Sequence, residues 1–411
     1  MKFQSVRGTH DIYGDEIIKY RYLEDILRSV VNIYDFEEIV TPIFESTDLF
    51  KKPLGEQSDI VLKEMYTFKD RNESFLTLRP EYTTPMIRAA ISNNLLEKLP
   101  QKLFGIGPMF RRERPQKGRY RQFNQINFEI LGSYDVAADF ELILLANDFL
   151  KKILPTNKIE LELNSLGDKN TLRSFKENLC TYFAKHKEAL SEESQTKIEN
   201  NPLRILDSKN SNDIEINKNA PKISDFYSKD TKKNFDDLLK LLTNSSLDFK
   251  VNSNLVRGLD YYCQTVFEFK TNDLGSQNTL IGGGRYDGLI KLLGGPDIPG
   301  VGWAGGIERM ILLLQGDFLK KQKTHLILID KKFKDYGLEL LNKLRMKNIP
   351  IYFDYKYNLK KSLSFANQSR AKYAIIIGED ELEKEAYTIK NLDENTQAMV
   401  SFEEIVSKLT K

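Results

Sequence analysis

The apolar pattern of this chain changes near residue 325, and that change constrains how the sequence divides into domains. From there on, continuous apolar runs at 325–329, 349–353 and 373–377 alternate with helical patterns. Strands that are apolar on both faces, with helices between them, are typical of a small α/β domain around a buried, largely parallel sheet. We therefore expect a separate α/β domain over residues 325–411.

The preceding part of the chain has a different pattern. Residues 16–34 and 141–151 repeat apolar side chains at helical spacing, and residues 159–163 alternate with the period of a strand. Residues 36–44 are strand-like but contain Pro42, which favours a sheet edge or an interface. Residues 171–245 combine helical patterns with a Lys/Asn-rich polar stretch. We interpret them as a helical insertion, and the Lys/Asn richness also suits an ordinary solvated surface.

The composition excludes several classes of protein. Hydrophobic residues make up 40% of the 411 residues, enough for a sizeable core, and no run approaches the roughly 18 apolar residues of a membrane span. The first residues lack the apolar stretch of a signal peptide. Two cysteines and three histidines argue against a disulfide scaffold, a cysteine zinc site or a polyhistidine metal centre. We expect a soluble, cytoplasmic protein without a membrane partner.

Positive charge is concentrated in residues 111–121, which carry six basic side chains and one acidic one, in a chain whose net charge is only +2. A turn at 115–118 is followed by a strand whose apolar face carries Ile126, Phe128 and Ile130. The opposite face is polar and carries Gln125, Asn127 and Glu129. A basic hairpin beside a polar strand face suits a polyanion lying next to a small polar ligand, because arginine binds phosphate oxygens bidentately. A solvated hairpin tip is the alternative.

Four further segments leave a choice between a ligand role and a structural one. In the segment 78–84, Glu81 follows a proline and could cap a helix or bind a ligand. The segments 255–262 and 282–288 are rich in Arg, Tyr, Asp and Gly, which suits a pocket, although buried tyrosines often need only a hydrogen-bond partner. The small residues of 300–309 allow close packing or close approach to a ligand, and they do not form a Walker A loop.

Taken together, these segments resemble the class II aminoacyl-tRNA synthetases, and the histidyl-tRNA synthetase family in particular. Residues 36–45 resemble motif 1, residues 110–129 motif 2 and residues 302–309 motif 3. The segments 255–262 and 282–288 match the two peptides typical of the histidine-specific members. The resemblance extends from residues 7–11 to residues 378–381, so it covers most of the chain.

The resemblance implies an α+β protein. It predicts an antiparallel-sheet catalytic domain in two parts, 1–170 and 246–322, separated by the helical insertion at 171–245. Residues 325–411 would then be an anticodon-binding domain. The family is homodimeric. Its members form histidyl-adenylate from L-histidine and ATP with Mg²⁺, and transfer the histidyl group to the terminal adenosine of tRNA(His).

The resemblance also implies roles for individual residues. Arg257 and Arg111 would be catalytic cations near the α-phosphate, and Arg309 would bind the γ-phosphate. The residues expected to bind ATP are Arg111, Glu113, Arg119 and Arg309. Glu81, Thr83 and Gln125 would bind the ammonium group of histidine, and Glu129 and Tyr262 its imidazole. The full set expected to bind histidine is Glu81, Thr83, Gln125, Glu129, Tyr261, Tyr262 and Tyr286. No protein side chain is assigned to a metal, and His10 is expected to be structural.

Two other functions fit the sequence less well. Some relatives of this family lack aminoacylation and act as regulatory subunits of ATP phosphoribosyltransferase, but they typically lose the arginine peptide and the C-terminal domain. This chain has Arg257 and about 85 residues of α/β pattern after motif 3. Another class II specificity, such as prolyl or threonyl, is disfavoured by Glu129, Arg257 and Tyr262 in their histidine-type contexts.

Overall fold

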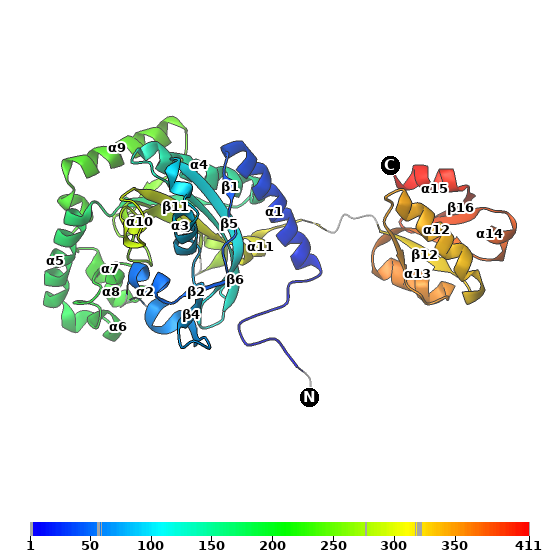
Figure 1. Cartoon of the computed structure of the whole chain (residues 1–411), viewed down its shortest axis with the longest axis horizontal. Helices are drawn as coiled ribbons and strands as arrows, with labels where there is room; N and C mark the ends of the chain where they lie inside the picture. The colour runs from blue at the N-terminus through cyan, green and yellow to red at the C-terminus, as the bar shows by residue number, and fades with distance from the viewer. Residues whose placement is uncertain are drawn as a thin grey trace. The chain divides into compact units, whose positions relative to one another are not determined.

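The computed structural model describes residues 3–55, 58, 60–275, 278–316, 318 and 323–410. The chain divides into two compact units, residues 1–318 and residues 319–411, called here the N-terminal and C-terminal units. Each unit has its own sheet with helices packed on it (Figure 1). This architecture confirms the expected α+β class, and the two units are described separately.

The central element of the N-terminal unit is a large sheet, which contains eight strands among the described residues. From β5 to β7 in the sheet order, each strand is antiparallel to its neighbour. The two edge strands differ: β1 is parallel to β5, and β8 is parallel to β7. The expected antiparallel catalytic sheet is therefore confirmed. In sheet order the strands are β1 (Glu37–Glu38), β5 (Gln101–Phe110), β6 (Gln122–Leu131), β11 (Gly300–Gly306), β10 (Thr279–Arg285), β9 (Cys263–Lys270), β7 (Glu160–Ser165) and β8 (Lys250–Val251).

Helices cover both faces of this sheet (Figure 1). Side chains of α1 (Asp15–Tyr34), α4 (Val136–Ile153), α9 (Lys229–Asn244) and α11 (Ile307–Leu313) share one buried cluster with Ile126, Phe128 and Ile130 of β6. On the other face, a second cluster includes side chains of α3 (Thr83–Ser92), α5 (Lys169–Lys185) and α10 (Leu289–Leu292). The alternation of β6 therefore sends its polar residues to the α3 side, as the sequence predicted.

The region proposed as an insertion is helical. Between α5 and α9 it contains α6 (Glu192–Gln195), α7 (Leu203–Leu206) and α8 (Ser211–Asn217). Phe175 and Leu179 of α5 join the cluster that contains α3, whereas Phe235 and Leu238 of α9 join the cluster that contains α1. These helices thus share buried clusters with the sheet, and the boundaries proposed for the catalytic parts and the insertion stay predictions.

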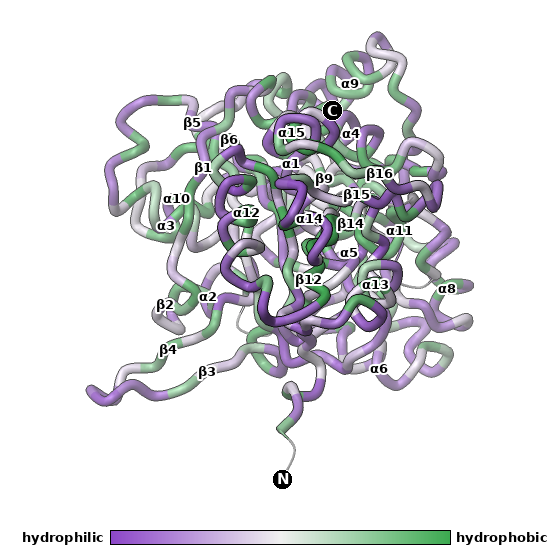
Figure 2. Tube along the Cα trace, turned by 90° about the vertical axis from the view of Figure 1, so that its right-hand side faces the viewer, coloured by the Kyte–Doolittle hydropathy of each residue, from purple (hydrophilic) through white to green (hydrophobic). Residues whose placement is uncertain are grey.

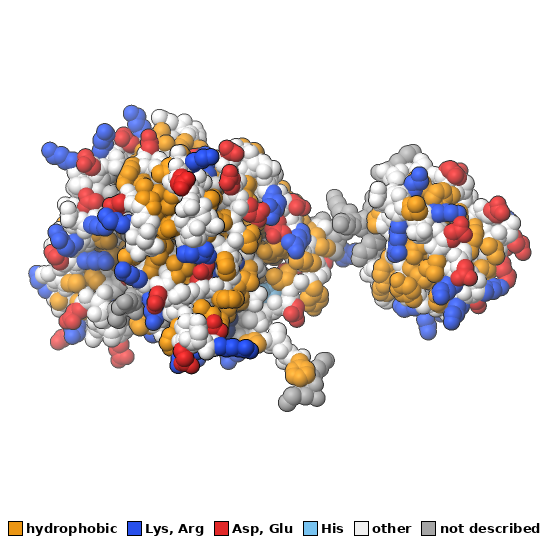
Figure 3. Space-filling view, in the orientation of Figure 1, with side chains coloured by type: hydrophobic (Ala, Val, Ile, Leu, Met, Phe, Trp, Pro, Cys, Tyr) orange, Lys and Arg blue, Asp and Glu red, His pale blue; other side chains and the backbone are white. Residues whose placement is uncertain are grey.

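The strand-like run predicted at 36–44 is broken in two. Only Glu37–Glu38 pairs with the large sheet, at its edge, while β2 (Phe44–Ser46) joins β4 (Phe75–Leu78) and β3 (Tyr66–Lys69) in a small sheet. The β3–β4 hairpin has a hydrophilic tip (Figure 2), and α2 (Asp48–Leu54) follows β2. Val40, Ile43 and Phe44 are exposed, Val40 to 76%, and Figure 3 shows hydrophobic side chains on the face that carries β2, β4 and α3.

The C-terminal unit has a mixed sheet, in the order β13 (Ile351–Phe353), β12 (Lys323–Leu328), β14 (Ala371–Ile377), β15 (Tyr387–Asn391) and β16 (Thr396–Val400). The three strands predicted from the continuous apolar runs are parallel, and β15 and β16 extend the sheet as an antiparallel hairpin. The helices are α12 (Lys334–Met346), α13 (Leu359–Gln368), α14 (Glu379–Glu383) and α15 (Phe402–Leu409). In neither unit is any described helix both long and apolar enough to cross a membrane.

Candidate active site

A cavity of about 190 Å³ lies on the polar side of β6 in the N-terminal unit. Residues from the segment before α3, the β5–β6 hairpin, the loop before β9, and α11 line it, although these segments are far apart in the sequence. Most of the predicted site residues line this cavity together: Glu81, Thr83, Arg111, Glu113, Arg119, Gln125, Arg257, Tyr261, Tyr262 and Arg309. The remaining two, Glu129 and Tyr286, are linked to it through Thr83 by hydrogen bonds described below.

One end of the cavity is strongly cationic. Arg111 follows β5, and its Nε donates to the carbonyl of Pro80 at 2.8 Å. Arg309, from the first turns of α11, donates to the carbonyls of Gly118 at 3.1 Å and Thr279 at 2.8 Å. Burial lowers the pKa of Arg309, and the nearby charges of Arg111 and Arg119 lower it further. Guanidinium groups that repel one another in this way form a good site for a polyanion, because the ligand removes the repulsion.

The basic hairpin is divided between this site and the surface. Arg111 and Arg119 line the cavity, whereas Arg112, Arg114 and Lys117 are exposed. Arg119 forms an ion pair with Glu113 across the hairpin, next to the bridge between residues 116 and 119. The solvated-tip interpretation thus holds for part of the segment, and the phosphate-site interpretation stays a prediction for Arg111 and Arg119.

The other end of the cavity is acidic and begins with Glu81, whose residue is only 3% exposed. Its two carboxylate oxygens accept hydrogen bonds from the amides of Thr83 and Thr84, both at 2.8 Å, in the first turn of α3. Glu81 therefore stabilises the start of the helix, as one of the two interpretations predicted, and it also lines the cavity, while its role in binding a ligand stays a prediction. Burial raises the pKa of Glu81 above its usual range.

Glu129 lies at the bottom of the acidic end and is completely buried. The Thr83 hydroxyl donates to one of its oxygens at 2.6 Å, and the Tyr286 hydroxyl donates to the other. Burial raises the pKa of Glu129 to about 8, although the two hydroxyl donors act in the opposite direction. The carboxyl group needs the space left by Gly302 on the neighbouring strand, where a Cβ would lie 1.6 Å from Glu129 Oε2.

Three tyrosines form one wall at this end. The ring centroids of Tyr261 and Tyr262 are 4.7 Å apart, and Tyr286 packs edge-on against Tyr261 at 5.8 Å. The Tyr261 hydroxyl lies 3.5 Å from Glu81 Oε2. This wall places phenol groups next to both buried carboxyl groups, which suits a small ring with polar nitrogen atoms.

Two side-chain amides at the floor of the cavity lack partners. Gln125 Oε1 and Asn127 Oδ1 are buried and accept no hydrogen bond from the described residues. A buried unpaired acceptor is costly, so these oxygens are well suited to N–H donors of a ligand. Asn127 was not predicted as a site residue, although its place on the polar face of β6 could have indicated it. His10, by contrast, packs on Tyr120, which lines the cavity, and contacts Glu16.

Arg257 lies between the two ends, on the loop that leads into β9. Its guanidinium pairs with Glu268 of β9 and lies 5.6 Å from the ring centroid of Tyr262. Neither Glu268 nor Glu308 was predicted from the sequence. Glu308 is buried beside the cavity and accepts hydrogen bonds from the backbone amide of Asn124 at 2.8 Å and from its side chain at 2.9 Å.

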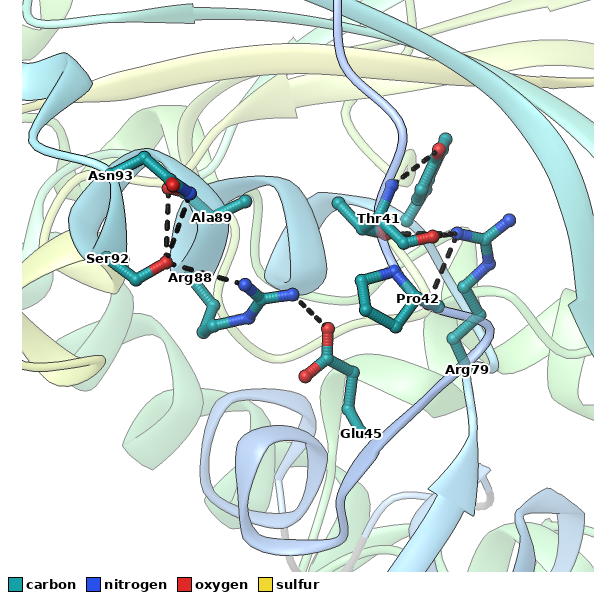
Figure 4. Close-up of polar contacts among 9 residues, drawn as sticks. Thr41, Pro42, Glu45, Arg79, Arg88, Ala89, Ser92 and Asn93 are labelled. Carbon is teal, nitrogen blue, oxygen red and sulfur yellow. Dashed lines mark hydrogen bonds and ion pairs between the residues drawn. The ribbon is translucent and has the colours of Figure 1, made fainter.

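Arg79, two residues before Glu81, binds the segment before β2 (Figure 4). It is 2% exposed, and its guanidinium donates to the Thr41 carbonyl and hydroxyl and to the Pro108 carbonyl, at 2.9–3.0 Å. The Thr41 carbonyl, which lies in the segment before β2, thus bonds to Arg79 instead of to a neighbouring strand. For this reason the run at 36–44 does not continue as one strand. Nearby, Arg88 of α3 pairs with Glu45. Arg79 thus connects the segment 39–44, through its buried Thr41, to Glu81, two residues along the chain.

Comparisons with known proteins agree with this geometry. A family profile described as histidyl-tRNA synthetase matches residues 8–310, and one described as anticodon binding domain matches residues 320–411. The histidine–tRNA ligase of Wolbachia pipientis is 44% identical over 409 residues, with all of both chains covered. That of Ehrlichia canis is 44% identical, covering 97% of this chain and 96% of the relative.

Solved structures give a similar result. The apo histidyl-tRNA synthetase of S. aureus superposes with a TM-score of 0.82 at 32% identity, over 100% of both chains. An ATP phosphoribosyltransferase regulatory subunit/histidyl-tRNA synthetase from Bacillus halodurans has a TM-score of 0.67 at 20% identity, over 90% of this chain and 97% of that one. The second likeness is one of fold alone.

Proposed function

Because this chain belongs to the histidyl-tRNA synthetase family, we propose that its cavity binds ATP at the arginine end and histidine at the acidic end. The chain is an enzyme with histidine–tRNA ligase activity, as its full-length relatives at 44% identity indicate. A regulatory subunit without this activity fits less well, because the arginine peptide and the C-terminal unit are both present. The observation that carries the assignment of the two ends is their chemistry: arginines line one end, and buried carboxyl groups lie at the other.

The reaction has two balanced steps. The carboxylate of histidine attacks the α-phosphorus of ATP, and pyrophosphate leaves as the P–O bond to it breaks. The terminal adenosine of tRNA(His) then attacks the carbonyl carbon of histidyl-adenylate through a ribose hydroxyl, and AMP leaves. Neither step requires a nucleophilic side chain, so the protein contributes orientation and charge.

The arginines act on the triphosphate. We assign Arg111 to the α-phosphate and the substrate carboxylate, and Arg309 to the γ-phosphate. Arg119 is assigned to the pyrophosphate side or to the tRNA acceptor end. Arg257 lies between the two ends, where a fixed cation stabilises charge that develops on the α-phosphate in the transition state. Glu113 is assigned to the adenine end of ATP. These roles agree with the mutual repulsion of the arginines in the ligand-free cavity.

The acidic end binds the amino acid. Glu81, Thr83 and Gln125 are assigned to the ammonium group, because an ammonium needs a carboxylate and neutral oxygen acceptors. Glu129 and Tyr262 are assigned to the two imidazole nitrogens, with Tyr261 and Tyr286 closing the wall. An amino acid without these nitrogens would leave buried polar groups unpaired, which rejects it strongly.

A magnesium ion is implied by the use of ATP. In the described part of the chain, no group of three or more His, Cys, Asp or Glu side chains could hold a metal ion. Two carboxyl groups, those of Glu113 and Glu308, line the cavity. Mg²⁺ keeps several waters and commonly binds through substrate phosphates and one or two carboxylates. The residues thus fit an ion that enters with ATP, where it supplies charge neutralisation, and Glu308 would hold it.

The remaining assignments concern tRNA and assembly. We propose that the C-terminal unit, which matches the anticodon binding profile, contacts the tRNA(His) anticodon, and that residues 171–245 contact its acceptor arm. We also propose a cytoplasmic homodimer. The exposed apolar residues Val40, Ile43 and Phe44 favour a dimer contact at the motif 1 segment.

The test of this function is pyrophosphate exchange into ATP, measured with each amino acid in turn. Exchange that depends on histidine alone is the expected result. Exchange with another amino acid would contradict the assignment of Glu129 and Tyr262, and no exchange with any amino acid would favour the regulatory alternative. Analytical ultracentrifugation of the wild type and of Val40→Asp tests the dimer, since the variant should dissociate if this segment forms the contact.

A further inference from the structure

Glu268 does not line the cavity, but it contacts the arginine proposed to be catalytic. It lies on β9 directly behind Arg257 and is half-buried. One of its carboxylate oxygens pairs with the Arg257 guanidinium. An arginine on a loop has many rotamers, and a carboxylate on a rigid strand restricts them.

The second oxygen of Glu268 connects this pair to the other phosphate-binding arginine. It accepts a hydrogen bond from the Thr279 hydroxyl at 3.2 Å. The carbonyl of the same Thr279 accepts a hydrogen bond from Arg309 at 2.8 Å. One residue at the start of β10 therefore links the support of Arg257 to the position of Arg309.

Charge around Glu268 is balanced by an ion-pair network. Lys270 Nζ lies 3.0 Å from Glu268 Oε2 and 2.8 Å from Glu162 Oε2. Glu162 in turn accepts a hydrogen bond from the Asn252 side chain at 2.7 Å. Since Glu268 is shared between two cations, it holds Arg257 without fully neutralising it, and the guanidinium keeps positive charge for an incoming phosphate.

The strand beside Glu268 leaves room for this arrangement. Gly282 of β10 is the register partner of Glu268. A Cβ at Gly282 would lie 2.4–2.6 Å from the guanidinium atoms of Arg257. The Arg257 guanidinium thus packs directly on the backbone of Gly282. A residue with a side chain at position 282 would displace the guanidinium from the cavity.

From these contacts we propose that Glu268 and Thr279 form a bracket that positions Arg257 and Arg309 together around the triphosphate before ATP binds. Both are positioning residues, because they act through the arginines. The proposal depends on the proposed function, in which Arg257 stabilises the transition state. A preformed cation there costs no reorganisation during the reaction, whereas a displacement of about 1 Å can cost on the order of 100-fold in rate.

The test is a double-mutant cycle in histidine-dependent pyrophosphate exchange. Glu268→Gln keeps the shape of the side chain and removes its charge, and we expect kcat to fall by about 10- to 100-fold with little change in the KM for histidine. In an Arg257→Ala background, Glu268→Gln should have almost no further effect, because its action passes through Arg257. Glu160→Gln, the same chemical change at the exposed start of β7, is the matched control and should leave kcat unchanged.

Thr279→Ala provides a second variant if Glu268→Gln folds poorly, and it should lower kcat less but with the same dependence on Arg257. Full kcat in both variants, or additive losses in the Arg257→Ala background, would overturn the proposal. These outcomes are distinct from a failure of the proposed function, which would appear as absence of histidine-dependent exchange in the wild type.

Discussion

Replacing Glu129 with Gln is predicted to make the N-terminal unit more stable at high pH. The pKa of Glu129 is raised to about 8 by burial, from an ordinary value of 4.5. At pH values between 4.5 and about 8, the Glu129 carboxyl keeps its proton in the folded chain but has lost it in the unfolded chain. The free energy of unfolding therefore falls as pH rises through this range. At about 1.4 kcal/mol per pH unit, the interval corresponds to about 5 kcal/mol, which is the upper limit of the cost of ionising Glu129 in place.

Glutamine cannot ionise, so the Glu129→Gln variant should lack this dependence. At about pH 5 the wild type and the variant should differ little, and the advantage of the variant should grow until about pH 8, where it levels off. The Thr83 or Tyr286 hydroxyl can turn to accept from the new amide, so no buried donor need be left unpaired.

The sequence provides a local probe for this measurement. Its only tryptophan, Trp303, is buried in the N-terminal unit and packs on Phe128, so its fluorescence follows the unfolding of that unit in urea. Glu188→Gln, at an exposed position outside the site, is the control and should show no pH-dependent difference from the wild type. A stability difference between Glu129→Gln and wild type that does not change with pH would refute the reasoning.

Three further predictions concern the same cavity. Arg257→Ala should lower the rate of adenylate formation by about 100- to 1,000-fold while changing the KM values of ATP and histidine much less, which single-turnover kinetics can separate; equal losses in binding and rate would contradict its role. Arg309→Ala should raise the KM for ATP by about 10-fold or more, through loss of a charge-assisted contact of about 1.5–3 kcal/mol, and leave the KM for histidine nearly unchanged. Gly302→Ala should destabilise the N-terminal unit by about 1–3 kcal/mol, measured by urea unfolding, because its Cβ overlaps Glu129; an unchanged unfolding midpoint would exclude that overlap.

The polar strand face was accessible from the sequence because it depends on local pattern, whereas the grouping of the arginines was expected from the family resemblance. The alternation along β6 correctly placed Gln125 and Glu129 on the face opposite Phe128. Asn127 lies on the same face, but the alternation alone does not show which polar residues of that face contact a ligand. Register within a strand is a local property, and for this reason it could be predicted.

What the sequence did not provide are contacts between segments that meet only in the folded chain. Nothing near Arg79 in the sequence indicates that it binds the carbonyl of Thr41, so the break in the run at 36–44 was not foreseen. Likewise, Glu268 pairs with Arg257 because β9 and the loop before it fold together, and Thr279 reaches Glu268 only through the pairing of β10 with β9. Such pairs carry no periodic signal, since any polar residue on a strand is compatible with solvent exposure as well.

In the proposed function, the charges of the ligand-free cavity determine how histidine lies in it. One end contains arginines that repel one another, and the other contains Glu81 and Glu129, both buried carboxyl groups with raised pKa values. The amino acid is a zwitterion. It reduces both the repulsion among the arginines and the cost of the buried carboxyl groups in only one orientation, with its carboxylate towards the arginines and its ammonium towards Glu81. The reversed orientation would place like charges together at both ends. Their repulsion costs more in a buried site, where the effective dielectric constant is low. In the proposed site this orientation also brings the carboxylate next to the α-phosphate, so the charges that orient the amino acid also align it for attack, whereas its selection depends on the proposed imidazole contacts of Glu129 and Tyr262.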